Sequence, residues 1–166
     1  TQVPLYAIRW LEQGKVVVGR RILNGSKGIG CVVYNSKDDE LPEFNCPLYT
    51  VHVRHKHEYR IHVFRGQIID MVIKRKRRGF VPLNKWIRSW DNGYVFCRDN
   101  LVVPDVVKQE ALKAVAALNL DFGAVDVAYR EKENRAYVLE VNTAPGIEGK
   151  TINSYVRAIE RELNAT

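Results

Sequence analysis

Two runs of alternating apolar and polar residues near the C-terminus constrain the fold of this 166-residue chain most strongly. Residues 120–129 read LDFGAVDVAY and residues 136–149 read AYVLEVNTAPGIEG, with a short charged segment between them. Alternation with period two is typical of β-strands. Because the connection is short and polar, the two runs predict an antiparallel hairpin.

The pairing of this hairpin follows from the face that it buries. If Arg130 faces Ala136, then Asp126 faces Glu140, and Asn142 follows two residues later on the same face. The opposite face is then apolar and consists of Val125, Val127, Tyr129, Tyr137, Leu139 and Val141. We therefore expect two carboxylates opposite each other on the face away from the core.

Two interpretations of the facing carboxylates are open. Like charges in this position repel each other, by up to about 1 kcal/mol when exposed. A hard cation removes the conflict, and Mg²⁺ prefers oxygen ligands of the kind that Asp126, Glu140 and Asn142 supply. The alternative is a solvent-facing acidic hairpin without a metal, since surface hairpins often carry charge.

A family resemblance adds to this reading. Gly-Ala-Val-Asp at residues 123–126 and Leu-Glu-Val-Asn-Thr-Ala-Pro-Gly at residues 139–146 resemble the metal-binding end of the ATP-grasp family. The similarity is strongest to the ribosomal-protein glutamate ligases (the RimK-like branch) and to related phage-encoded proteins. The resemblance implies an α+β ATP-grasp fold whose two lobes clasp ATP. It also implies a metal, Mg²⁺ or alternatively Mn²⁺, held by Asp126, Glu140 and Asn142.

A glycine-rich segment separates strands that are predicted over residues 15–18 and 31–34. Glycines let backbone N–H groups approach an anion. The segment is neither a Walker A loop nor a dinucleotide fingerprint, because a strand rather than a helix follows it, and a plain hairpin turn is the alternative. By the resemblance, Arg20 or Arg21 reaches the α- and β-phosphates of ATP, and the loop that covers the phosphates contains Ser26, Lys27, Gly28, Ile29 and Gly30.

The next two predicted strands supply further binding residues by the same resemblance. Residues 47–53 match the strand that leads into the hinge, where the backbone of Tyr49, Thr50 and Val51 would bind adenine. In the strand that follows, polar residues alternate with Tyr59, Ile61 and Val63. Glu58 would accept hydrogen bonds from the ribose hydroxyls, and Arg60 would face the phosphates or the acyl substrate. A solvated polar strand face is the alternative.

The predicted catalytic residues are cations. A strand over residues 67–75 runs into the basic segment 74–78, and Lys74 holds the position of a phosphate-contacting residue in the family. Arg88 lies in a stretch that resembles the Arg-Ser-Asn sequence of the glutamate ligases, although Trp90 replaces the Asn. By the resemblance, Arg60, Lys74 and Arg88 hold the charge of the phosphoryl group and of the acyl oxyanion.

Helices are predicted over residues 4–13, 104–118 and 151–163, where apolar residues recur at helical spacing. Their predicted inward faces are Leu5, Ile8 and Leu11; Val107, Ala111, Ala114, Val115 and Leu118; and Ile152, Tyr155, Val156, Ile159 and Leu163. We predict a small lobe with the phosphate loop at residues 1–46. Residues 47–166 then form a large lobe with the hinge strand and the metal-binding hairpin.

The composition indicates which binding partners and which cellular location to expect. A net charge of +7 favours an anionic partner, such as a nucleotide, an acidic substrate or a nucleic acid. Three scattered cysteines fit neither a disulfide framework nor a zinc site, so we expect reduced thiols in the cytoplasm. No apolar run approaches the roughly 20 residues of a membrane span, so we expect no membrane association.

The resemblance implies an ATP- and Mg²⁺-dependent ligase that joins a carboxylate to an amine, or to a thiol, through an acyl phosphate. The substrates would be amino acids, peptides or other small molecules. ATP-grasp proteins usually carry an N-terminal domain before the ATP-grasp lobes, for which this chain has no room. We expect a fragment of a longer protein, or a partner, including a second copy, that supplies this part. The alternatives are an ATP-binding regulatory module without ligase activity and, less favoured, a basic nucleic-acid-binding domain.

Overall fold

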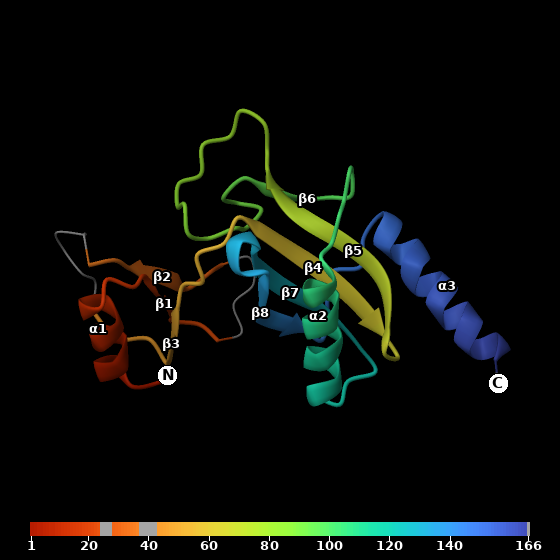
Figure 1. Cartoon of the computed structure of the whole chain (residues 1–166), viewed down its shortest axis with the longest axis horizontal. Helices are drawn as coiled ribbons and strands as arrows, with labels where there is room; N and C mark the ends of the chain where they lie inside the picture. The colour runs from red at the N-terminus through yellow and green to blue at the C-terminus, as the bar shows by residue number, and fades with distance from the viewer. Residues whose placement is uncertain (24–27, 37–42, 166) are drawn as a thin grey trace. The chain divides into compact units, whose positions relative to one another are not determined.

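The computed structural model of the chain describes residues 1–23, 28–36 and 43–165. The chain forms two units, whose helices and strands are labelled in Figure 1. Unit 1 combines Thr1–Val53 with Lys76–Val95, and unit 2 combines Arg54–Arg75 with Phe96–Thr166. The chain therefore passes from one unit to the other three times. The two lobes predicted from the sequence have a single boundary along the chain, between residues 46 and 47.

Unit 1 is built on a three-stranded antiparallel sheet in the order β2–β1–β3. Its elements are α1 (Pro4–Glu12), β1 (Val17–Arg20), β2 (Cys31–Tyr34) and β3 (Leu48–Val51). The core of the unit consists of Ala7, Leu11, Val17, Tyr34, Cys46 and Tyr49. A Cβ atom at Gly19 would lie 2.6 Å from Cys46 Sγ and 2.8 Å from the Tyr34 ring. Glycine at this position therefore lets β1 approach the core closely.

Unit 2 is organised around a five-stranded sheet in the order β6–β5–β4–β7–β8. The strands are β4 (His57–Phe64), β5 (Gln67–Lys76), β6 (Tyr94–Cys97), β7 (Phe122–Arg130) and β8 (Arg135–Asn142). Strand β4 pairs antiparallel with β5 on one side and with β7 on the other. Strand β7 is buried along residues 123–129, so both of its faces are shielded from solvent.

Helix α2 (Asp105–Ala117) covers one face of this sheet (Figure 1). Three of its predicted inward residues, Val107, Ala111 and Val115, are buried against the apolar residues of β4 and β7. Ala114 packs at the margin of this core. Leu118 is 56% exposed because it follows the last helical turn, so that part of the predicted face is wrong.

The other two helices are confirmed as helices, but only part of each predicted face is buried, namely Leu11 in α1 and Tyr155 in α3. Helix α3 (Lys150–Asn164) buries Thr151, Tyr155 and Ala158. The Tyr155 ring lies edge-on to His62 and to Phe122, which fixes the packed face of the helix. The predicted residues Ile152, Val156, Ile159 and Leu163 are exposed, and in α1 so are Leu5 and Ile8. None of the described helices is long and apolar enough to cross a membrane.

The hairpin of β7 and β8 confirms that Asp126 faces Glu140. Next to the turn, however, Arg130 pairs with Arg135, one residue before the partner expected from the sequence. Leu139 is an extra residue on β8, and this β-bulge brings the later pairs back to the expected register.

The bulge also corrects the predicted apolar face of β8. A shift of one residue moves side chains to the other side of a sheet. Between the turn and the bulge, Ala136 therefore packs against the core in place of Tyr137. Leu139 is 39% exposed, so the prediction that Tyr137 and Leu139 line the core is wrong. Val141, beyond the bulge, packs there as expected.

Candidate active site

Four charged side chains from three strands meet on the face of the sheet opposite α2; we call Glu58, Arg60, Lys74 and Asp126 the charged cluster. Glu58 and Arg60 alternate with core residues on β4, and Arg60 pairs directly with Asp126 on β7. Arg60 donates two hydrogen bonds to the Asp126 carboxylate, Nε to Oδ1 at 2.7 Å and Nη2 to Oδ2 at 3.0 Å. Lys74 Nζ, from β5, lies 2.5 Å from Glu58 Oε1 and 3.0 Å from Asp126 Oδ2.

The carboxylates of the charged cluster are buried, so the protonation of each member depends on the charges of its neighbours. Glu58 is 5% exposed and Asp126 is 4% exposed, so Glu58 does not belong to a solvated strand face. Burial raises the pKa of Glu58, but a hydrogen bond with His55 and the charge of Lys74 outweigh it and hold this pKa at about 2. Burial lowers the pKa of Lys74, but the charges of Asp126 and Glu58 raise it above its usual value. Glu58 is therefore ionised and Lys74 protonated at neutral pH.

The other two predicted metal ligands lie on β8, next to Asp126. Glu140 is exposed and pairs with Asp126 across the strands. Burial lowers the pKa of Arg60, whereas the hydrogen bonds and charge of Asp126 and the charge of Glu140 raise it above its usual value. Asn142 donates from Nδ2 to the Ala124 carbonyl oxygen at 3.4 Å, which leaves its amide oxygen as an acceptor.

These oxygen atoms fit a hard divalent cation. Carboxylate and amide oxygens suit Mg²⁺, which commonly keeps water and phosphate ligands as well. Glu140 and Asn142 offer accessible oxygens, whereas Asp126 already accepts hydrogen bonds from Arg60 and Lys74. Within the described ranges, no group of three or more His, Cys, Asp or Glu side chains could hold a metal. Asp126, Glu140 and the amide oxygen of Asn142 are the groups here that could hold such a cation.

Phe96 on β6 belongs to this site, although the sequence did not reveal it. The guanidinium carbon of Arg60 lies 4.6 Å from the centre of the Phe96 ring, and Lys74 Nζ lies 5.7 Å from it. These distances allow cation–π attraction to both cations. Strand β6 was not predicted, because its four residues follow a long irregular segment. The aromatic residue within that short β-rich run was the available signal.

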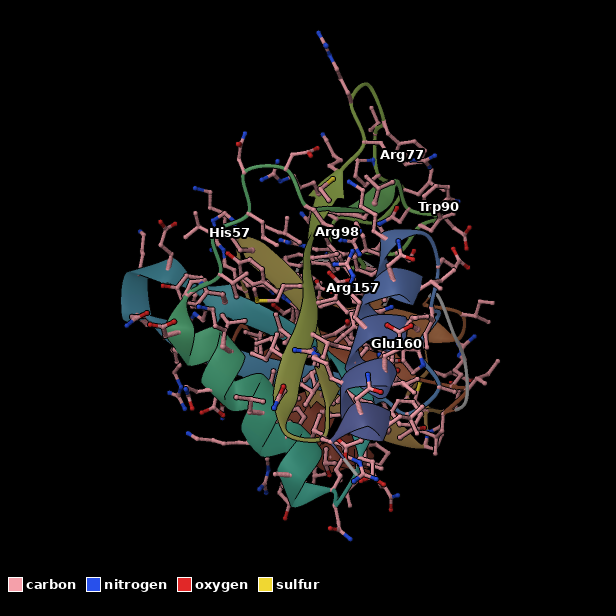
Figure 2. All side chains as sticks on the ribbon, turned by 90° about the vertical axis from the view of Figure 1, so that its right-hand side faces the viewer. His57, Arg77, Trp90, Arg98, Arg157 and Glu160 are labelled. Carbon is pink, nitrogen blue, oxygen red and sulfur yellow. The ribbon has the colours of Figure 1, made fainter. Side chains whose placement is uncertain are left out.

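A second polar network occupies the same face, beyond the charged cluster. Arg98 donates to the Asp70 carboxylate from Nε at 3.2 Å and from Nη2 at 2.5 Å, and Nη2 also donates to Thr151 Oγ1 at 2.7 Å. The Thr151 hydroxyl donates to Asp70 Oδ2 at 2.7 Å. Figure 2 shows Arg98 near the N-terminal end of α3, with Arg157 and Glu160 further along the helix. This network attaches α3 to the sheet.

The predicted phosphate loop belongs to unit 1. Ser26 and Lys27 lie outside the described residues. Gly28 and Gly30 have φ angles of 83° and 76°, a left-handed conformation that favours glycine. The Arg21 N–H donates to the Gly30 carbonyl oxygen at 2.8 Å, which closes the end of the loop beside β1.

The remaining predicted residues of unit 1 are Arg20 at the end of β1, the exposed Ile29, Arg88, and Tyr49, Thr50 and Val51 on β3. Tyr49 is a buried core residue, and its backbone N–H and carbonyl both hydrogen-bond to Thr1. The guanidinium carbon of Arg88 lies 5.7 Å from the centre of the Tyr94 ring. The structure thus gathers one set of predicted residues in unit 2: Glu58, Arg60, Lys74, Asp126, Glu140 and Asn142.

Solved ATP-grasp ligases resemble this fold. The ligase PsnB, solved with a minimal precursor, Mg and ADP, matches with a TM-score of 0.61 at 15% identity, over 90% of this chain and 45% of its own. D-alanine–D-alanine ligase from Bacillus anthracis matches with a TM-score of 0.59 at 16% identity, over 95% of this chain and 59% of the ligase chain. A RiPP-associated ATP-grasp ligase from Chryseobacterium gregarium was solved in complex with ADP and a leader and core peptide. It matches with a TM-score of 0.57 at 18% identity, over 93% of this chain and 50% of the ligase chain.

No protein-family model and no curated protein matches the sequence. The chain spans about half the length of the solved structures that it matches. The agreement covers nine-tenths or more of the present chain in these three cases and includes both of its units. The predicted fold class is therefore confirmed: this chain has the α+β fold of the ATP-grasp ligases.

Proposed function

We propose that the chain is the nucleotide-binding part of an ATP- and Mg²⁺-dependent ligase, which joins a carboxylate to an amine, or to a thiol, through an acyl phosphate. The charged cluster carries the proposal. It places two cations on the buried carboxylate of Asp126, opposite Glu140, on a sheet of the ATP-grasp fold. Cations fixed beside carboxylates are suited to a reaction that moves negative charge between phosphoryl and acyl oxygens.

Two displacements make up the proposed reaction. A substrate carboxylate oxygen attacks the γ-phosphorus of ATP, the bond to the bridging oxygen breaks, and ADP leaves. The amine then attacks the acyl carbon, inorganic phosphate leaves, and the nitrogen loses a proton. Arg60, Lys74 and Arg88 stabilise the negative charge that develops on the phosphoryl and acyl oxygens, since charged donors form the stronger hydrogen bonds.

The binding roles extend the same proposal. Asp126, Glu140 and Asn142 hold Mg²⁺, which neutralises phosphate oxygens when it is bound. Glu58 accepts hydrogen bonds from the ribose in addition to its contacts with Lys74 and His55. The backbone of residues 50 and 51 faces adenine, since both backbone groups of Tyr49 already hydrogen-bond to Thr1. The loop at residues 26–30, with Arg20 or Arg21 before it, covers the phosphates. The motif at residues 139–146 favours the glutamate-ligase and phage-encoded branches of the family.

The acceptor in this proposal is an amino acid or a peptide. PsnB was solved with the precursor peptide PsnA2, and the macrocyclase MdnC was solved with the precursor peptide MdnA. A further neighbour of the same fold is a D-alanine–D-alanine ligase. Carboxylates of amino acids and acidic peptides are therefore the first substrates to examine.

Trapping with hydroxylamine tests the proposed chemistry without knowledge of the natural amine. Hydroxylamine attacks an acyl phosphate and gives a hydroxamate, with release of phosphate. The protein is incubated with ATP, Mg²⁺ and hydroxylamine against a panel of amino acids and acidic peptides, and hydroxamate and ADP are measured together. We expect equal amounts of the two products with at least one carboxylate.

Two variants complete this test. Glu140→Ala should abolish both products, whereas Glu133→Ala, which removes a carboxylate from the turn of the same hairpin, should retain them. Full turnover by Glu140→Ala would contradict the metal assignment. Nucleotide binding without hydroxamate from any carboxylate would instead favour an ATP-binding module without ligase activity.

A further inference from the structure

The carboxylate of Asp126 is nearly saturated by positively charged donors. A carboxylate has about four lone-pair sites. Three N–H donors of Arg60 and Lys74 approach its oxygens, at 2.7, 3.0 and 3.0 Å. The residue is 4% exposed, so water has little access to it. A proposed metal ligand is therefore also the counter-ion of two cations.

Arg60 and Lys74 hold Asp126 in different ways. Arg60 lies directly opposite it in the register of β4 and β7, and its planar fork makes two parallel bonds, which leaves little freedom of movement. Lys74 reaches over from β5 and shares its ammonium group with Glu58 at 2.5 Å. Because Lys74 has a flexible stem and a second carboxylate partner, it can leave Asp126 while Glu58 still compensates its charge.

The charges around Asp126 determine when Lys74 can leave it at little cost in free energy. The charged cluster contains two carboxylates and two cations, so it is close to neutral by itself. A bare divalent cation at Asp126 would add two positive charges beside Arg60 and Lys74, of which the carboxylate of Glu140 offsets only one, and repulsion is strong where water is scarce. A nucleotide brings negative phosphates together with the metal, and these give Lys74 a new anionic partner.

We propose that Lys74 is a counter-ion latch on Asp126. The latch opposes binding of a divalent metal by itself, and it opens when nucleotide phosphates arrive with the metal and take over the lysine. This inference rests on the proposed function and adds an order of events to it: metal and nucleotide bind as one unit. Lys74 is in this respect a positioning residue for a metal ligand.

The affinity of the protein for Mn²⁺ alone tests the latch. The free ion is measured by electron paramagnetic resonance during a titration at constant ionic strength. Lys74→Gln removes the latch, and Arg98→Gln is the matched control, because it removes one positive charge from the Asp70 pair on the same face. We expect Lys74→Gln to bind Mn²⁺ at least about tenfold more tightly than the wild type, and Arg98→Gln to differ by less than about twofold.

A double variant distinguishes the latch from direct attraction of Mn²⁺ by Glu58. Lys74→Gln leaves Glu58 charged and 3.1 Å from His55 Nε2, so Glu58 itself could attract Mn²⁺ in that variant. Glu58→Gln combined with Lys74→Gln removes both charges and keeps the pair of Arg60 and Asp126. This double variant should still bind Mn²⁺ more tightly than the wild type. It also replaces Lys74→Gln in the test if that single variant does not fold.

Three outcomes would contradict the latch: no gain in Lys74→Gln, an equal gain in Arg98→Gln, or loss of the gain in the double variant. A parallel calorimetric titration with ADP at saturating Mn²⁺ keeps this result separate from the proposed function. If the wild type binds ADP and the variants show no gain in Mn²⁺ affinity, the nucleotide site stands and the latch is wrong. If the wild type binds no ADP, both are contradicted.

Discussion

Glu58 shows how a carboxylate remains charged inside the protein. Burial alone raises its pKa, but Lys74 Nζ lies 2.5 Å from one of its oxygens and His55 Nε2 lies 3.1 Å from the other. Together they lower the pKa to about 2. Removal of one partner from a buried ion pair is costly, because the charge that remains has no compensation. The charged cluster therefore depends on each of its members.

We predict that Glu58 makes the stability of the protein pH-dependent in acid. Its pKa is about 2 in the folded protein against an ordinary value of 4.5, so the unfolded chain takes up the proton first as the pH falls. The stabilisation is present above about pH 5, is lost progressively between about pH 4.5 and about pH 2, and is on the order of 3 kcal/mol.

Urea unfolding of the wild type and Glu58→Gln measures this contribution. The difference between their free energies of unfolding should fall by more than half between about pH 7 and about pH 3. Titrating groups that do not contact Glu58, such as the buried His62, are common to both proteins and cancel in the difference. A difference that stays constant over this range would show that the charge of Glu58 does not stabilise the fold.

Phe96 should stabilise the cations of the cluster through its ring face. Phe96→Leu keeps an apolar side chain but loses the attraction to Arg60 and Lys74, which is worth about 1 kcal/mol. Phe122→Leu is the matched control, since Phe122 is 39% exposed against 44% for Phe96 and its ring lies against Tyr155. We expect the larger loss in denaturant unfolding for Phe96→Leu. Equal losses would mean that the ring contributes only its apolar area.

At the scale of the elements, the β-bulge at Leu139 decides which face of β8 carries the proposed metal ligands. The register next to the turn, continued without a bulge, would pair Leu139 with Asp126 and Glu140 with the core residue Val125. The bulge moves Glu140 opposite Asp126 instead. Bulges often redirect a side chain in this way beside functional sites.

Deletion of Leu139 should remove the bulge but keep the site, because Glu140 then follows Val138 directly and still lies opposite Asp126. Val141 and Asn142 also keep their partners Val125 and Ala124, so we expect Mg²⁺-dependent binding of ADP to be retained. Leu139→Ala keeps the residue count and should retain binding, with a loss of about 1 kcal/mol or less in denaturant unfolding, since the side chain is 39% exposed. Loss of ADP binding in the deletion variant, with the fold intact, would show that the pairing of Glu140 with Asp126 is not sufficient to form the site.

The elements also show what the sequence could and could not predict. Alternation placed Asp126 opposite Glu140, and helical spacing found all three helices, because these patterns are local. The bulge was missed, since nothing in the spacing of Leu139 marks an extra residue. The contacts of Lys74 with Glu58 and Asp126 were missed as well, because they require β5, β4 and β7 to be neighbours. On α3, Tyr155 is the one member of the predicted apolar face that is buried, because its contacts with His62 and Phe122 set the packed face.

At the scale of the whole molecule, the proposed nucleotide-binding residues are distributed over both units. The phosphate loop, residues 49–51 and Arg88 belong to unit 1, and the charged cluster with Glu140 and Asn142 belongs to unit 2. Since the chain passes three times between the units, neither is a continuous segment that could be excised.

The central claim is that Asp126 belongs to a site shared by a metal and a nucleotide. Calorimetric titration of the purified chain with ADP, with and without Mg²⁺, tests it most directly, with Asp126→Asn beside Asp121→Asn as the matched control, because Asp121 has an exposed side chain in the same unit. The wild type and Asp121→Asn should bind ADP only with Mg²⁺, and Asp126→Asn should lose this binding by about a hundredfold or more. Binding of ADP that is independent of Mg²⁺, or unchanged in Asp126→Asn, would contradict the claim.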